Sequence, residues 1–178
     1  MKGYYKNPEA NAEVFDGDWF KTGDLGRIDD DGYIHITGRK KEIYVLSGGK
    51  NVAPLVVEET MKSIPVISQV FLVGDGRKFC SALVTLDVGV ILRDNLGMNP
   101  DKVPRDPMEQ IEELERRGHK LSDFVESDEI RLDIESQISE LNKRFMNPEQ
   151  IKKFTILPRD LNIDSGELTP TLKIRRKQ

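Results

Sequence analysis

GRKKEIYVLSGGKN, residues 38–51, combines a glycine pair and four basic residues with a short apolar run. Glycine beside lysine is typical of a phosphate cradle, but a P-loop needs two glycines five positions apart, followed by lysine and serine or threonine. Gly48, Gly49 and Lys50 do not have that spacing. The segment alone therefore predicts a short strand, EIYVL, and an ordinary turn, with Lys40 and Lys41 as solvated surface charges.

The residues upstream of this segment contain aromatic side chains without a regular period, from Tyr4 to Phe20. Such side chains need a partner surface, which so short a segment cannot build alone. Residues 28–38, IDDDGYIHITG, predict a turn followed by a strand, because aspartate and glycine favour turns and β-branched residues favour strands.

Asp24 stands between glycines in KTGDLG, residues 21–26. Two interpretations of this aspartate stay open. An aspartate in a tight turn usually bonds its own backbone. A carboxylate on an open loop can instead accept hydrogen bonds from two sugar hydroxyls.

The residues downstream predict a helix and then a hairpin. Pro54 suits the first turn of a helix, and apolar residues follow it at i, i+4 and i+7 spacing. Residues 66–87 predict a hairpin, because an Asp-Gly turn signal separates two β-rich runs. On the second strand, alternate residues from Cys80 to Leu86 share one face.

The remainder of the chain is predicted to be mainly helical. Residues 88–126 have a helical pattern broken by glycines and prolines, which indicates an insertion of short helices. Residues 127–145 form a regular helix with one apolar stripe, residues 151–157 form a last strand, and the tail is loop-like and then basic. The sum is a small α+β domain of antiparallel strands flanked by helices.

The composition excludes several function classes. The chain has 178 residues, 37% hydrophobic and 33% charged, with a net charge of -4. No general attraction to nucleic acid or anionic membranes is expected at that charge. The single cysteine, Cys80, excludes an internal disulfide and fits a reducing, cytoplasmic compartment. We expect no metal site, because His35 and His119 have no plausible partner ligands and are interpreted as structural.

Several motifs follow one another in residues 16–59, DGDWFKTGDLGRIDDDGYIHITGRKKEIYVLSGGKNVAPLVVEE. They are W-F-x-T-G-D, D-G-Y, G-R-x-K-E, S-G-G-x-N-V-x-P and a glutamate four residues after the proline. Residues 166–176, GELTPTLKIRR, add a terminal lysine motif. In this order the motifs resemble the C-terminal core of the AMP-forming acyl-CoA synthetase (adenylate-forming) superfamily, most closely its long-chain and bubblegum-type fatty-acid–CoA ligase branch.

The resemblance implies a division of the chain. Residues 39–178 would be the small mobile C-terminal domain, with the helical insertion at about 88–126. Residues 1–38 would be the closing edge of the large N-terminal adenylation domain. The family's upstream phosphate loop and acyl pocket are not present, so we expect a fragment or excised C-terminal domain that is inactive alone.

The same resemblance implies roles for individual residues. Asp24 would accept the ribose hydroxyls of AMP, and Arg39 would also contact the ribose. Lys41 would be the hinge about which the small domain turns between the two half-reactions. Asn51 would lie near the phosphate.

Two further roles concern the thioester and adenylation steps. Gly48 and Gly49 would line the pantetheine path, where glycine allows close approach. Lys173 would be the catalytic adenylation lysine, steadying the α-phosphate as charge develops. The family often has glycine where this chain has Leu172, which leaves Arg175 as an alternative to Lys173.

The function implied is formation of acyl-CoA, AMP and pyrophosphate from a fatty acid, ATP and CoA. ATP or AMP, CoA and Mg²⁺ would be the cofactors, with Mg²⁺ held mainly by the N-terminal domain, which would also be the main partner. No nucleic-acid partner is expected, and peripheral membrane association of the parent enzyme is left open. The alternatives are an aryl-CoA ligase, a fatty-acyl-AMP ligase, a carrier-loading adenylation domain, or a non-catalytic binding module of the same fold.

Overall fold

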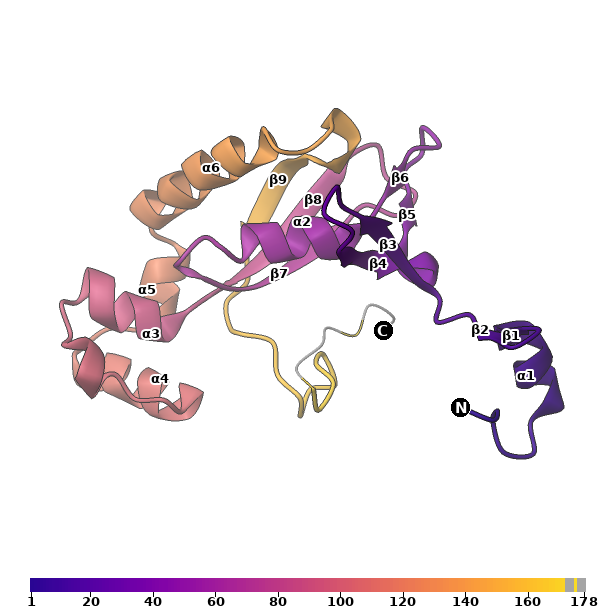
Figure 1. The fold of residues 1–178 in the computed structure, drawn as a ribbon. Helices are drawn as coiled ribbons and strands as arrows, with labels where there is room; N and C mark the ends of the chain where they lie inside the picture. Colours follow the sequence, from indigo (N-terminus) through magenta and orange to yellow (C-terminus); the bar gives the residue numbers. More distant parts are fainter. Residues whose placement is uncertain (172–174, 176–178) are drawn as a thin grey trace.

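The computed structural model describes residues 1–171 and Arg175. Within them, three antiparallel hairpins precede one three-stranded sheet. The hairpins are β1 (Phe15–Asp16) with β2 (Trp19–Phe20), β3 (Asp24–Ile28) with β4 (Ile34–Arg39), and β5 (Tyr44–Val45) with β6 (Asn51–Val52). The short helix α1 (Pro8–Val14) lies with β1 and β2 away from the rest of the molecule (Figure 1).

The β3–β4 hairpin confirms the predicted turn and strand and adds a strand that was not predicted. The Asp29 carboxylate closes the turn by accepting hydrogen bonds from the backbone N–H groups of Asp31 and Tyr33, at 3.1 and 2.8 Å. A hydrogen bond from His35 does most to lower the pKa of Asp29. Both interpretations of Asp24 placed it in a turn or open loop, and both are corrected here, because β3 begins at Asp24. Its residues are mostly exposed, so they lack the apolar alternation that marks a half-buried strand.

The main sheet has the order β7 (Ile67–Val73), β8 (Cys80–Leu86), β9 (Ile151–Ile156). The predicted hairpin is confirmed, although residues 74–79 form a longer loop than a two-residue turn. The even-numbered residues of β8 are all buried, as predicted. The expectation of a wholly antiparallel sheet is corrected, because β9 runs parallel to β8. The long helical connection between these strands makes a parallel return possible.

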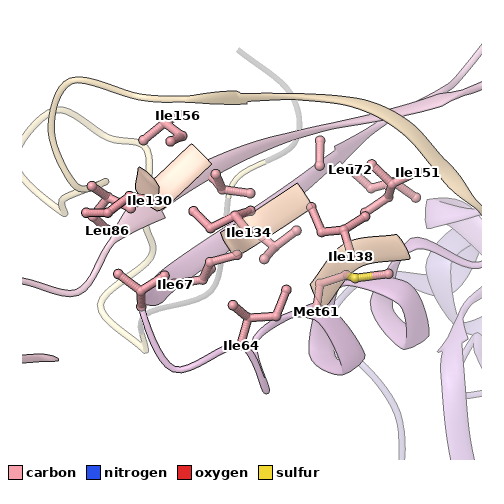
Figure 2. Close-up of a cluster of buried hydrophobic side chains, with 14 of the residues drawn as sticks. Met61, Ile64, Ile67, Leu72, Leu86, Ile130, Ile134, Ile138, Ile151 and Ile156 are labelled. Carbon is pink, nitrogen blue, oxygen red and sulfur yellow. The ribbon is translucent and has the colours of Figure 1, made fainter. Parts of the chain in front are cut away.

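Two helices build the core against this sheet. They are α2 (Pro54–Met61) and α6 (Asp128–Asn142), and both confirm predicted helices. Proline at the first turn begins α2, and the Ser127 hydroxyl caps α6 by accepting the Ile130 N–H at 3.4 Å. Figure 2 shows Met61 of α2 beside Ile138 of α6, in one cluster with side chains from all three strands.

The connection between β8 and α6 consists of short helical pieces, as predicted for residues 88–126. They are α3 (Val88–Val90), the π-turn η2 (Ile91–Asn95), the 3-10 turn η3 (Pro100–Lys102), α4 (Pro107–Arg116) and α5 (Leu121–Val125). Another 3-10 turn, η4 (Asn147–Glu149), leads from α6 into β9. Ile91, Leu92 and Leu114 are fully buried, so the connection belongs to the same core. No helix of the described residues is both long and apolar enough to cross a membrane.

Candidate functional site

The predicted ribose-contacting residues are neighbours in the structure. Asp24 begins β3, Arg39 ends β4, and the two are register partners across the hairpin. Arg39 Nε donates to Asp24 Oδ1 at 2.9 Å, although the Arg39 side chain is 62% exposed. The backbone N–H of Asp24 donates to the Thr22 hydroxyl, so threonine holds the turn and the aspartate carboxylate faces the guanidinium. Among the described residues, the Arg39 hydrogen bond to this carboxylate goes to Oδ1, so Oδ2 can still accept a hydrogen bond from a ligand.

The predicted hinge lies in a single 3-10 turn, η1 (Lys40–Glu42), between β4 and β5. The residues on either side, Arg39 and Ile43, have extended backbones with ψ of 138° and 130°. The Lys40 N–H donates to the Gly23 carbonyl at 2.8 Å, which fixes the start of the turn to the loop before β3. Lys41 is exposed. A rotation of the following elements would therefore concentrate in very few backbone dihedrals.

The glycine loop between β5 and β6 is held by backbone hydrogen bonds, within itself and to the loop between β7 and β8. The Gly49 N–H donates to the Leu46 carbonyl and the Ser47 N–H donates to the Arg77 carbonyl, at 2.8 and 2.9 Å. These N–H groups are thus used within the protein and do not converge on a phosphate. Gly49 has a φ of +72°, which favours glycine. A Cβ at Gly48 would meet no atom within 4 Å, so no contact inside the described chain requires glycine there.

Asn51 is exposed at the start of β6, opposite Val45. The β4 end lies close to this region, because a Cβ added at Gly38 would be 3.7 Å from the Cβ of Ala53. The structure therefore brings the Arg39 end of one hairpin towards the Asn51 end of the next. Lys173 and Leu172 lie outside the described residues, and Arg175 is exposed.

Sequence reasoning gave no structural role to three acidic residues. Glu58, the motif glutamate of α2, is only 4% exposed and accepts the Leu72 N–H at 2.7 Å, which joins α2 to β7. Its place next to buried Val57 on the apolar face of α2 was the signal available for it. Asp160 and Glu167 organise the tail, and nothing in their exposed loop sequence signals this.

Two kinds of chemistry receive no support from the described residues. They contain no group of three or more His, Cys, Asp or Glu side chains that could hold a metal ion. Cys80 is buried, and burial raises the pKa of its thiol. It therefore lacks the exposed, low-pKa environment of a reactive thiolate.

The comparisons with known proteins agree with the motif order. The family model of the AMP-binding enzyme C-terminal domain matches residues 41–127. The chain is 40% identical, over 99% of its length, to the long-chain-fatty-acid–CoA ligase FadD15 of Mycobacterium tuberculosis. Residues 41–127 thus match this C-terminal domain family, and the chain as a whole is similar to long-chain-fatty-acid–CoA ligases. It is also 37% identical to the human long-chain-fatty-acid–CoA ligase ACSBG1, over 98% of its length.

The family resemblance covers only part of each relative. The chain spans 27% of FadD15 and 24% of ACSBG1, about a quarter of each. Among solved structures, the adenylation domain of a carboxylic acid reductase from Segniliparus rugosus, in complex with AMP and a co-purified carboxylic acid, matches 98% of this chain and 23% of its own, with a TM-score of 0.65 at 23% identity. The O-succinylbenzoate–CoA synthetase of Bacillus subtilis, in complex with AMP, matches 100% and 27%, with a TM-score of 0.57 at 22% identity. At these identities the likeness shows the α+β fold.

Proposed function

We propose that this chain is the C-terminal part of an AMP-forming long-chain fatty-acid–CoA ligase. The parent enzyme would convert ATP, a fatty acid and CoA into acyl-CoA, AMP and pyrophosphate. The observation that carries this proposal is 40% identity along 99% of the chain to a ligase of that name. An animal relative that is also named a long-chain-fatty-acid–CoA ligase adds weight, since ACSBG2 of Gallus gallus is 37% identical over 98% of the chain.

The proposal assigns binding of the nucleotide ribose to Asp24 and Arg39. A carboxylate can accept two vicinal hydroxyls, and a guanidinium can donate to their oxygens. Their 2.9 Å contact orients both groups before the nucleotide arrives. AMP in the carboxylic acid reductase domain, and ATP with magnesium in the O-succinylbenzoate–CoA synthetase, support an adenylate ligand.

The remaining residues are assigned to steps that need movement. Lys41 would be the hinge, because its short turn is flanked by extended residues. Gly48 and Gly49 would admit the pantetheine arm of CoA, and the open space around both supports this. Asn51 would approach the phosphate and Lys173 would stabilise the adenylation transition state. The proposal assigns Mg²⁺ mainly to the large domain.

Residues 1–38 would form the closing edge of that large domain, and residues 39–178 the mobile domain. Burial supports this division, because none of residues 1–37 is buried and Gly38 is the first buried residue. Trp19 is 81% exposed and Ile34 is 73% exposed. The N-terminal adenylation domain of the same parent chain would cover them. A cytoplasmic location stays part of the proposal, on the argument from the single cysteine.

The test is a turnover assay of the full-length enzyme that carries this chain. With palmitate, ATP, Mg²⁺ and CoA we expect palmitoyl-CoA and AMP in equal amounts. Asp24→Asn should lower kcat/KM for ATP by about 10- to 100-fold, as expected for a hydrogen bond to a charged group. Asp31→Asn, on the tip of the same hairpin, is the matched control and should leave kcat/KM unchanged.

The alternative functions give different results in the same assay. Turnover of aryl acids alone would indicate an aryl-CoA ligase. Acyl-adenylate without CoA transfer would indicate a fatty-acyl-AMP ligase, and transfer to a carrier protein would indicate a carrier-loading domain. Nucleotide or CoA binding without any turnover would indicate a non-catalytic module.

A further inference from the structure

The tail after β9 is fastened to the main sheet at Asp160. One carboxylate oxygen accepts the Thr85 hydroxyl at 2.6 Å, and the other accepts the Ser68 hydroxyl at 2.7 Å. Thr85 lies on the central strand β8 and is only 1% exposed, and its oxygen also accepts the Gln69 N–H at 3.0 Å. The start of the tail is therefore bonded to two strands of the core sheet.

A bidentate ion pair then folds the tail back on itself. Arg159 Nη1 donates to Glu167 Oε2 at 2.8 Å, and Nη2 donates to Oε1 at 2.9 Å. The same carboxylate accepts the Ser165 hydroxyl at 2.6 Å and the Asn162 N–H at 3.3 Å. Leu168, the next residue, is only 5% exposed and donates its N–H to the Asn162 carbonyl at 3.0 Å. Parallel Arg–carboxylate bonds restrict orientation as well as distance.

The backbone of Glu167 also holds the far end of the lysine motif. The Arg175 N–H donates to the Glu167 carbonyl at 2.8 Å. Glu167 thus has its side chain bonded to the start of the tail and its carbonyl bonded to a residue two positions after Lys173 in the sequence. Asp160 and Arg159 are adjacent, so the ion pair begins next to the residue that bonds to Ser68 and Thr85 of the sheet.

We infer that Glu167, held by Arg159, is a positioning residue for the adenylation lysine of this enzyme. The inference rests on the proposed function and extends it. A lysine that stabilises developing charge must be placed before the reaction, and a displacement of about 1 Å can cost roughly 100-fold in rate.

The test separates the two half-reactions in the full-length enzyme. Acyl-adenylate formation is measured by ATP–pyrophosphate exchange with palmitate, and thioester formation is measured from supplied palmitoyl-adenylate and CoA. We expect Glu167→Gln and Arg159→Ala each to slow the first by about tenfold or more and to leave the second within about twofold. Because both changes remove the same Arg159–Glu167 ion pair, the double variant should form acyl-adenylate no more slowly than the slower single variant. Glu112→Gln, an exposed glutamate of α4, is the matched control and should change neither.

Each outcome distinguishes a positioning role of Glu167 from a role in folding alone. A misfolded domain would lose both half-reactions, so equal losses would overturn the inference, as would no loss in either. A second measurement on the chain follows hydrogen exchange at the Arg175 amide, which should be protected in the wild type and exposed in Glu167→Gln. Wild-type protein without exchange activity on any acid would overturn the proposed function and the positioning role together. Wild-type activity with unaffected variants would overturn the positioning role alone.

Discussion

The charge state of Glu167 reports on whether the tail keeps its folded hydrogen bonds. Hydrogen bonds from Arg159 and then Ser165 lower its pKa from an ordinary value of 4.5 to about 2. A carboxyl group with a lowered folded-state pKa stabilises the fold above its unfolded pKa, and this stabilisation is lost as the pH falls through the folded value. We therefore expect the tail to loosen between about pH 4.5 and 2, which carboxyl ¹³C NMR titration of Glu167 would follow.

The titration has an internal comparison. In Arg159→Ala the largest cause of the shift is removed, so the pKa of Glu167 should rise towards 4.5. Arg144→Ala changes an exposed arginine after α6 and should leave the Glu167 curve unaltered. An unchanged curve in Arg159→Ala would mean that the ion pair does not form in solution.

At the same scale, the sequence indicated some candidate site residues and could not indicate others. Asp24 and Arg39 belong to a motif order, so the resemblance named both before the hairpin brought them together. Their roles remain predictions. Asp160 and Glu167 stand among polar loop residues with no period, and their partners are set by tertiary contacts with Thr85 and Arg159.

Among the helices and strands, those with a large buried face were predicted best from the sequence. The stripe of α6 repeats over fifteen residues and was predicted closely. β3 offered no buried face and was missed. The direction of β9 could not be predicted, because parallel pairing depends on how the long connection crosses the sheet and not on the strand's own residues.

The α6 stripe gives a direct stability prediction. Ile134 is fully buried against the sheet, so Ile134→Ala should lower the free energy of unfolding of the chain by about 2–5 kcal/mol, measured by urea denaturation. Leu132 lies two residues away and is 63% exposed. Leu132→Ala should stay within about 0.5 kcal/mol of the wild type. Equal effects would contradict the assigned face of the helix.

The η1 turn gives a prediction about the reaction cycle. Proline at position 41 fixes its own φ and disfavours a helical conformation at Lys40, so Lys41→Pro should restrict rotation of the small domain. In the full-length enzyme we expect thioester formation to fall by about tenfold or more while acyl-adenylate formation is largely kept. Lys41→Ala keeps the backbone freedom and should preserve both. Equal loss of both half-reactions in Lys41→Pro would contradict a hinge at this residue.

At the scale of the whole molecule, the N-terminal residues contrast with the core. The buried cluster draws its residues from Leu46 onward, whereas Trp19, Ile28 and Ile36 are each at least 60% exposed. Under the proposed function, the large N-terminal domain would cover these apolar side chains on the two small hairpins. The Asp24–Arg39 pair lies on one of these hairpins, so the nucleotide site that we propose would be completed by that domain.

This contrast leads to a complementation experiment. The chain alone should give no palmitoyl-CoA with ATP, Mg²⁺, palmitate and CoA, and the N-terminal part supplied as a separate chain should restore synthesis. Trp19 is the single tryptophan of this chain, so its emission should shift to shorter wavelength as the exposed ring becomes buried. Trp19→Ala should weaken the restored activity, because the association loses a large apolar side chain. Restored synthesis with unchanged Trp19 emission would place the contact elsewhere on the chain, and activity of the chain alone would contradict a divided site.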